Sequence, residues 1–237
     1  MNKMKLNISK TKSMIINCNG SSIIHINNQI IETVNEIKYL GIIIDNKLNF
    51  KSNLDYVCKK IAKKIYFLCS IRKNISINTA INIYNVIIKP HFEYCSTVLF
   101  MCNAEMMSRL QKLQNKGMRC VLKLNKYTSI DFMLQSLNWL NVEQRLKMNV
   151  LIFVFKMKHK MLPKYLYEKL VYVSDVHDYR LRNRNNFRLK KYSSEKAKNM
   201  TMYSGLSLFN SLPNKLKDES NLKVFKKCII EYCKETF

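Results

Sequence analysis

The stretch NLDYVCKKIAKKIYFL, from Asn53 to Leu68, decides the fold class of this 237-residue chain. Its apolar residues recur every three or four positions, as on one face of an α-helix: Leu54, Val57, Ile61, Ile65 and Leu68. The lysines fall outside this apolar stripe: Lys59, Lys60, Lys63 and Lys64. The pattern predicts an amphipathic helix that starts near Lys51 and has one buried face and one basic face.

The same helical period continues toward the C-terminus. A second helix is predicted from Ala80 to Ile88, with a break or kink near Pro90, because proline cannot donate a helical hydrogen bond. A third helix carries apolar residues from Met106 to Val121, interleaved with basic ones: Arg109, Lys112, Lys116 and Arg119.

Two later helices are marked by capping residues. Asn141 is followed by Gln144 at the third helical position, a capping-box pattern that opens a fourth helix, which Leu162-Pro163 ends. A last helix is predicted from about Asn221, with Ser220 as its cap.

The first fifty residues instead indicate β-structure. An Asn-Gly pair separates the apolar runs Ser13–Asn17 and Ser22–Ile26, which predicts a hairpin between these two runs. Gln29–Thr33 is a further strand. Ile37–Asp45 is predicted as one run of strand, in which Gly41 marks a bulge or a close approach of another backbone.

These elements predict a mainly α protein with a small N-terminal β segment and helical regions after it. The expected segments are 1–50 (β), 51–125 (helical bundle), 126–173 (helical region), 174–199 (exposed basic loop or linker) and 200–237 (tail with the final helix).

Charge indicates the class of partner. The chain has 41 Lys and Arg against 16 Asp and Glu, a formal net charge of +25. Such a field attracts polyanions, and the usual partner of a basic domain is nucleic acid, here RNA or DNA. The alternative is that the charge only reflects base composition and that the chain is a helical protein–protein interaction module.

Localisation signals and metal motifs are not visible in the sequence. No run of 18 apolar residues predicts a membrane span, and the first residues, MNKMKLNISKTK, lack an apolar signal core. An intracellular location, nuclear or cytoplasmic, is expected rather than secretion. The eight cysteines include no pair with metal-binding spacing, so reduced thiols and no metal site are expected.

Five segments, in order along the chain, resemble parts of one known family. They are Leu6–Ile16 (LNISKTKSMII), Lys38–Gly41 (KYLG) with Asp45 and Phe50, Ile88–Cys95 (IKPHFEYC), Leu110–Lys116 (LQKLQNK) with Met118-Arg119, and Gly205–Pro213 (GLSLFNSLP). Together they resemble the C-terminal part of a jockey-like non-LTR retrotransposon reverse transcriptase, an RNA-directed DNA polymerase. The resemblance implies that 1–50 is a remnant of the polymerase palm and that 51–125 is its helical thumb.

The resemblance also implies that this chain is catalytically incomplete. Such polymerases hold two Mg²⁺ ions on carboxylates, and the family carries an aromatic-Ala-Asp-Asp turn just before the Asn-x-x-Lys-Thr segment. Here the corresponding residues, Met1–Lys5, include no acid, and the first acidic residue is Glu32. No catalytic residue, metal ligand or cofactor is therefore expected, and Asp45 is interpreted as a turn residue. One alternative is that the chain is a piece of a split enzyme, with the missing palm and fingers as its partner.

The candidate nucleic-acid-binding residues come in four groups, each with a structural alternative. Lys10 is a possible vestigial general-acid lysine, although the match leaves it open between Lys10 and Lys12, and either is otherwise a solvated strand-end lysine. Leu40 and Gly41 resemble the primer grip, against a plain buried strand. The basic helix is expected to contact phosphates, against a solvated face, through Lys59, Lys60, Lys63 and Lys64. A basic stretch with aromatic residues is expected to bind single strands, against a disordered linker, through Arg180, Arg182, Arg184 and Arg188.

Overall fold

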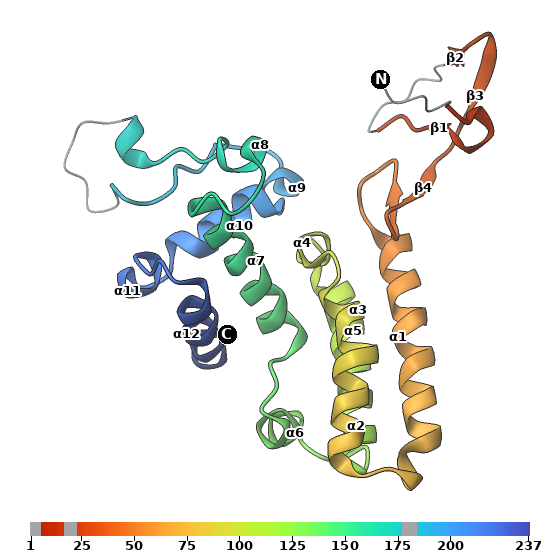
Figure 1. Ribbon diagram of the computed structural model, residues 1–237, viewed down its shortest axis with the longest axis vertical. Helices are drawn as coiled ribbons and strands as arrows, with labels where there is room; N and C mark the ends of the chain where they lie inside the picture. Colours follow the sequence, from red (N-terminus) through yellow and green to blue (C-terminus); the bar gives the residue numbers. More distant parts are fainter. Residues whose placement is uncertain (1–5, 17–22, 177–183) are drawn as a thin grey trace. The chain divides into compact units, whose positions relative to one another are not determined.

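A computed structural model describes residues 6–16, 23–176 and 184–237 and confirms a mainly helical chain with a small N-terminal β region (Figure 1). The chain divides into two compact units, residues 1–60 and 61–237. The boundary falls inside the first long helix, α1 (Lys51–Ile71).

The N-terminal unit begins with a small three-stranded sheet. After a short 3-10 turn, η1 (Ile8–Lys10), its strands are β1 (Lys12–Ser13), β2 (Ile24–Ile26) and β3 (Gln29–Thr33). Strand β3 lies in the middle, parallel to β1 and antiparallel to β2.

The hairpin predicted between the first two apolar runs is therefore wrong in its pairing. Strand β2 pairs with the strand that follows it, through a two-residue turn at Asn27 (φ 50°) and Asn28 (φ 59°). Asparagine tolerates this left-handed conformation, which matches the twist of a hairpin. The Asn-Gly pair on which the prediction rested lies outside the described residues.

A second hairpin replaces the single strand predicted over Ile37–Asp45. Strands β4 (Glu36–Tyr39) and β5 (Ile42–Asp45) pair antiparallel and are joined by Leu40 and Gly41. Both turn residues have positive φ, 47° and 86°. Glycine adopts this conformation without strain, so Gly41 serves a tight turn and not a bulge.

The predicted kink near Pro90 is a change of helix type. Helix α2 (Ile77–Ile83) passes into a π-helical turn, η3 (Tyr84–Ile88), and then into α3 (Lys89–Glu93). The backbone N–H of Lys89 donates to the carbonyl of Tyr84, five residues earlier. The π turn lies immediately before Pro90, where proline removes a helical donor.

Three further elements complete the chain up to Leu122. A short 3-10 turn, η2 (Arg72–Asn74), follows α1, and α4 (Ser96–Leu99) precedes the long α5 (Ala104–Leu122). The apolar stripe predicted from the sequence is confirmed at Leu54, Ile61, Ile65 and Leu68, which are buried. No helix in the described part of the chain is long and apolar enough to cross a membrane.

Helix α7 (Val142–Lys158) is the central element of the C-terminal unit. It follows α6 (Ile130–Leu137) and begins with the predicted capping box, in which the Gln144 backbone N–H donates to Asn141 Oδ1 at 2.8 Å and the Asn141 N–H donates to Gln144 Oε1 at 2.9 Å. Helices α10 (Thr201–Asn210) and α12 (Leu222–Thr236) both pack against α7 (Figure 1). Asn221, not Ser220 as predicted, caps α12, because its side chain accepts from the Lys223 backbone.

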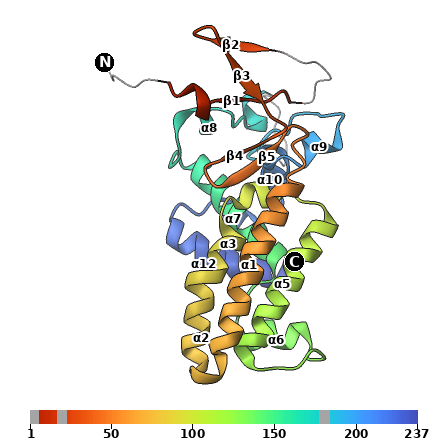
Figure 2. The same ribbon diagram turned by 90° about the vertical axis from the view of Figure 1, so that its right-hand side faces the viewer.

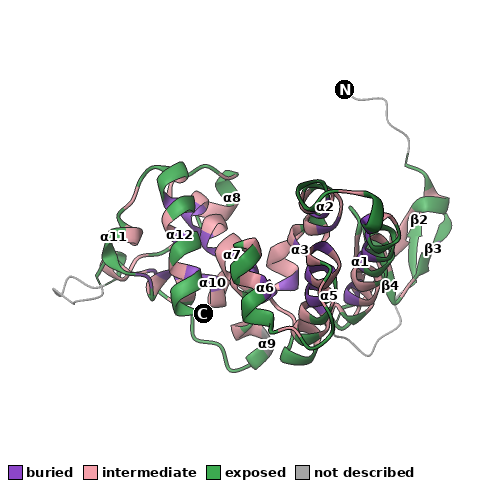
Figure 3. Ribbon diagram, turned by 90° about the horizontal axis from the view of Figure 1, so that it is seen from below, coloured by how far each residue is buried: buried purple, intermediate pink, exposed green. Residues whose placement is uncertain are grey.

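An aromatic core joins these three helices. Phe155 of α7 stacks on Phe225 of α12 with ring centroids 4.3 Å apart, and Phe209 of α10 lies 6.3 Å from Phe225. All three rings are buried, and buried positions lie on the inward sides of the helices (Figure 3). The short elements around this core are α8 (Lys164–Tyr167), η4 (Val173–Asp175), α9 (Glu195–Lys198) and α11 (Asn214–Lys217).

The segment predicted as an exposed basic loop or linker is docked at Phe187, whereas Arg188 and most of the residues after it are exposed, as predicted. Phe187 is only 2% exposed and belongs to the aromatic core. The Asn210 side chain accepts from the Phe187 N–H and donates to the Phe187 carbonyl, both at 2.8 Å. The buried ring and the two hydrogen bonds to its backbone show that the chain is docked at this residue. The charged residues around Phe187 in the sequence do not predict this docking.

Candidate nucleic-acid interface

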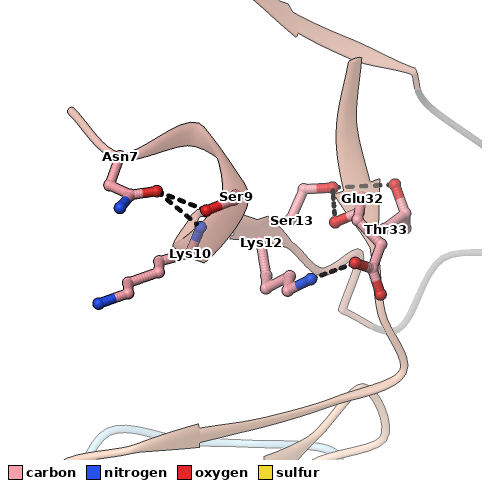
Figure 4. A network of polar contacts seen from close by, with 7 residues as sticks. All are labelled: Asn7, Ser9, Lys10, Lys12, Ser13, Glu32 and Thr33. Atoms are coloured by element: carbon pink, nitrogen blue, oxygen red, sulfur yellow. Dashed lines mark hydrogen bonds and ion pairs between the residues drawn. The ribbon is translucent and has the colours of Figure 1, made fainter. Parts of the chain in front are cut away.

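The Asn-x-x-Lys-Thr segment forms a self-capped turn (Figure 4). Asn7 Oδ1 accepts from Ser9 Oγ at 2.7 Å and from the Lys10 backbone N–H at 3.3 Å, while the Asn7 carbonyl accepts from Thr11 Oγ1 at 2.9 Å. Asn7 and Thr11 are thereby used in holding the backbone of η1. Lys10 enters these bonds through its backbone and not through its side chain.

Lys10 and Lys12, between which the sequence left the choice open, have different surroundings. Lys12 forms an ion pair with Glu32 of the neighbouring strand β3. Beside it, Ser13 Oγ and Thr33 Oγ1 lie 2.9 Å apart in the same sheet. The Lys10 side chain is exposed and points away from this network (Figure 4). Lys10 is therefore the better placed of the two to meet an external phosphate.

Asp45 fastens the β4–β5 hairpin to the start of α1. Its Oδ1 accepts the backbone N–H groups of Lys47 at 3.0 Å and Asn49 at 3.1 Å, and its Oδ2 accepts that of Phe50 at 2.7 Å. Asn53, in the first turn of α1, accepts the N–H of Ile43 at 3.1 Å. The buried Asp45 carboxylate thus stabilises a turn by accepting backbone hydrogen bonds, as the sequence predicted.

The β4–β5 hairpin lies beside the start of α1 (Figure 2), and Tyr56 of α1 contacts a lysine from each of these elements. Lys38 of β4 donates to the Tyr56 hydroxyl at 2.8 Å, and its Nζ lies 4.5 Å from the ring centroid. Lys60 of α1 lies 4.5 Å from the same ring. The hydrogen bond from Lys38, and then that from Lys60, lowers the pKa of Tyr56 below its usual value of 10.0. This cluster of Lys38, Tyr56 and Lys60 does not follow from the sequence alone, because no local spacing relates Lys38 to Tyr56.

The hairpin tip is exposed. Leu40 is 74% exposed, Tyr39 is 62% exposed, and Gly41 is exposed as well. The alternative that Leu40 and Gly41 lie in a buried strand is wrong, because they form the turn that projects from β4 and β5. An apolar side chain in water at a left-handed turn position is costly, so this tip is a candidate contact surface.

Of the four lysines outside the apolar stripe of α1, three lie on its exposed side. Lys59, Lys60 and Lys63 are exposed, and Lys64 is half-buried. Lys63 and Lys64 have no acidic residue three or four positions away in either direction. Lys59 and Lys63, and likewise Lys60 and Lys64, are like charges one turn apart, an arrangement that destabilises a helix by roughly 0.2–0.5 kcal/mol per pair.

The arginines of the basic stretch are only partly placed. Arg184 and Arg188 are exposed, whereas Arg180 and Arg182 lie outside the described residues. Arg188 is held in an extended segment whose backbone N–H donates to the Val171 carbonyl at 2.7 Å. The structure thus gives a fixed position to this end of the stretch.

Three of the segments that carry the resemblance are packing elements. Glu93, in the Ile88–Cys95 segment, pairs with the buried Arg145 of α7 at 3.1 Å. Gln114, in the Leu110–Lys116 segment, donates to the Leu140 carbonyl at 2.7 Å, which also accepts from Arg145 at 3.2 Å. A Cβ on Gly205 would stand 2.8 Å from Val150 Cγ1, so α10 needs glycine to lie this close to α7.

The described residues do not fit a catalytic Mg²⁺ pair. Among residues 6–16, 23–176 and 184–237, no three His, Cys, Asp or Glu side chains gather closely enough to hold a metal ion. Asp45, the buried carboxylate of the N-terminal unit, has both oxygens occupied by backbone N–H groups.

Comparison with known proteins supports a link to reverse transcription. No family model and no solved structure matches the chain. A probable RNA-directed DNA polymerase from transposon X-element of Drosophila melanogaster is 30% identical to it over 91 residues. The match covers 37% of this chain and spans 10% of the length of the Drosophila protein. This distant, partial homology supports an origin related to reverse transcriptases.

Proposed function

We propose that this chain binds a nucleic-acid duplex through the basic side of α1, as the thumb and C-terminal portion of a jockey-like retrotransposon RNA-directed DNA polymerase. The observation that carries the proposal is the cluster of Lys38, Tyr56 and Lys60. It places a hairpin lysine beside the first turns of a helix whose exposed side carries further lysines.

Ammonium groups on one helix side contact phosphates without reading bases. Lysine is a point charge, so such contacts set affinity and position but not sequence preference. The like-charge pairs of α1 are unfavourable for the isolated helix and become favourable once phosphates lie between them. The role of α1 is thus to hold a duplex backbone, with the exposed tip at Leu40 and Gly41 as a second contact on the same unit.

The test measures the salt dependence of binding to a labelled RNA–DNA heteroduplex. In the test variant, Lys59, Lys60, Lys63 and Lys64 of α1 are changed together to Gln, which keeps helix propensity. Each phosphate contact contributes roughly 0.7–0.9 to the slope of log affinity against log salt, so losing four flattens the slope by about 3. Affinity should fall alike for every sequence.

A matched control removes four exposed lysines elsewhere: Lys215, Lys223, Lys226 and Lys227. This variant has the same net charge as the α1 variant and should keep most of the wild-type slope. Equal flattening in both variants would show that α1 only contributes to a general field. A chain that fails to bind nucleic acid at any salt concentration would favour the helical protein–protein interaction module.

The same proposal includes catalytic incompleteness. The purified chain, given a primed RNA template with Mg²⁺ or Mn²⁺, is expected to incorporate no nucleotides above background. Two-metal chemistry needs a carboxylate cluster, and the described residues do not provide one. Template-dependent synthesis by this chain alone would overturn this part of the proposal.

A further inference from the structure

A groove of about 980 Å³ lies in the C-terminal unit, between the segment after α8 and helix α10. Its rim carries the exposed cations Lys169, Arg188, Lys190 and Lys191. Tyr192 and Tyr203 also line it, with ring centroids 5.8 Å apart and planes at 69°. We refer to this feature as the C-terminal groove.

The walls of the C-terminal groove are fixed by backbone contacts. Tyr172 and Phe187 form an antiparallel bridge, and the Arg188 N–H donates to the Val171 carbonyl at 2.7 Å. Asn210 of α10 brackets the Phe187 backbone with two hydrogen bonds of 2.8 Å. Phe187 is therefore anchored to α10 and Arg188 to the segment after α8, so the start of the cationic stretch has a fixed backbone.

The charge of the groove is almost wholly of one sign. Glu168 is the single acidic side chain among the described residues that line it. That carboxylate is paired with Lys164 at 3.3 Å, outside the groove lining. A partner with regularly spaced negative charges and flat apolar surfaces would complement both the cations and the two tyrosine rings that line the groove.

We propose that the C-terminal groove binds a single-stranded segment of RNA or DNA, with phosphates on the rim and bases against Tyr192 and Tyr203. Unpaired bases offer the free faces that aromatic side chains stack on, whereas bases inside a duplex are already stacked. The inference rests on the proposed function, since it adds a single-strand site to a duplex-binding chain. It assigns the two sites to different residues, so each is testable without the other.

The first test removes one of the two tyrosine rings that line the groove. Labelled oligo(U) and oligo(dT), which form little secondary structure, are titrated against Tyr192→Ala. Loss of one stacked base should weaken binding roughly 5- to 150-fold. Tyr192→Phe keeps the ring and should bind nearly as wild type. Tyr192 is 40% exposed, so its truncation should leave helicity unchanged.

The control for the aromatic change is Tyr127→Ala, which removes an 82% exposed tyrosine outside the groove. Equal affinities of Tyr192→Ala and Tyr127→Ala would overturn the stacking role. Equal effects on oligo(U) and oligo(dT) mean that stacking on Tyr192 depends on neither the 2′-hydroxyl nor the thymine methyl group. A larger effect on oligo(U) than on oligo(dU), which differs from it only in the 2′-hydroxyl, identifies RNA as the ligand.

The second test changes the rim. The triple variant Arg188→Gln, Lys190→Gln and Lys191→Gln should flatten the single-strand salt slope by about 2, at roughly 0.7 per contact. The matched variant Lys223→Gln, Lys226→Gln and Lys227→Gln removes three exposed charges from α12 and should change it little. Equal slopes in the two variants would contradict the proposal, as would a poly-glutamate peptide that binds the groove as well as the oligonucleotides do.

Crosslinking separates this inference from the proposed function. Oligo(U) carrying 5-iodouracil is expected to crosslink within residues 187–206 under ultraviolet light, as located by mass spectrometry. Crosslinks confined to α1 would overturn the groove. The α1 quadruple variant should lose duplex affinity and keep this crosslink, and the groove variants should do the reverse. Retained groove crosslinks with an unchanged duplex salt slope would sink the proposed function alone.

Discussion

The N-terminal and C-terminal units are stabilised by different interactions. Among described residues 6–60, only Ile31 and Leu54 are buried apolar side chains. The first unit is instead held by side chains that bond the backbone, at Asn7, Asp45 and Asn53. In residues 61–237, three stacked phenylalanine rings and the apolar faces of long helices form an extended core.

This difference predicts different energies of opening. A hydrogen bond contributes a net of about 0.5–1.5 kcal/mol, whereas burying one large apolar side chain contributes about 1.5–3 kcal/mol. The first unit should therefore open locally at lower cost than the helical unit. Residues 6–50 are expected to exchange amide hydrogens faster than α5, α7 and α12.

The largest expected effect is on the free energy of unfolding, and it follows from removing the ring of Phe155 in the helical unit. Phe155→Ala removes a fully buried ring that contacts Phe225, and should cost about 3–5 kcal/mol in the free energy of unfolding. The control Phe132→Ala removes a ring that is 54% exposed and should stay within about 0.5 kcal/mol of wild type. Urea unfolding followed by circular dichroism measures both. Similar losses in the two variants would show that the stacked rings are not the stabilising core.

A smaller and local effect is expected at Asp45. Asp45→Ala leaves three backbone N–H groups without their acceptor, a loss of about 1–3 kcal/mol. Hydrogen exchange should accelerate in β4, β5 and the first turn of α1, with urea unfolding of the helical unit unchanged. Asp45→Asn keeps one carbonyl oxygen, so the Phe50 amide should be affected more than those of Lys47 and Asn49. Protection unchanged in Asp45→Ala would mean that the hairpin does not depend on this carboxylate.

The smallest expected effect compares two tyrosines, one from each unit. Hydrogen bonds from Lys38 and then Lys60 lower the pKa of Tyr56, while burial raises the pKa of Tyr84. Because the folded-state pKa of Tyr56 is depressed, its stabilising contribution is full above pH 10.0 and is lost as pH falls through the folded value. For Tyr84 the contribution is full below pH 10.0 and is lost as pH rises through its raised value.

The measurement is a pH titration of Cζ chemical shifts in carbon-13-labelled tyrosine. Tyr56 should ionise first of the two, and Lys38→Gln should move its pKa upward by removing the larger cause. An unchanged Tyr56 pKa in Lys38→Gln would show that Lys38 of the hairpin does not hydrogen-bond to Tyr56 of α1.

Local spacing predicts the long helices α1, α5, α7 and α12 and their apolar sides, whereas α6 and α10 do not follow from it. The period of three or four placed Ile61, Ile65 and Leu68 on the buried face of α1, and the Asn141–Gln144 pair gave the start of α7. Such features depend on residues within one or two turns of each other. Asp45 was also interpreted correctly, since its partners lie within five residues.

Features that join distant residues were missed. Lys38 meets Tyr56 across a hairpin whose turn was itself not recognised, because Ile37–Asp45 has enough strand formers for one continuous strand. The charged neighbours of Phe187 predict an exposed loop, and the docking at Phe187 depends on contacts with Asn210 and Tyr172, which are distant in sequence. Contacts of this kind depend on residues that are distant in sequence. The spacing of residues within one segment does not reveal which distant residue it contacts.

The π turn at Tyr84–Ile88 lets this region lose one residue without a change in how the following helix packs. An α-helix advances about 100° per residue, so deleting one residue within α5 or α7 would rotate every later side chain off the core. A π turn already contains one residue more than an α turn, and deleting the exposed Val86 would convert it to α while α3 keeps its phase. Phe92 would stay buried and Glu93 would still reach Arg145. Relatives that differ by a single codon in this region are thus expected to share one structure, with the insertion absorbed inside a helix rather than in a loop.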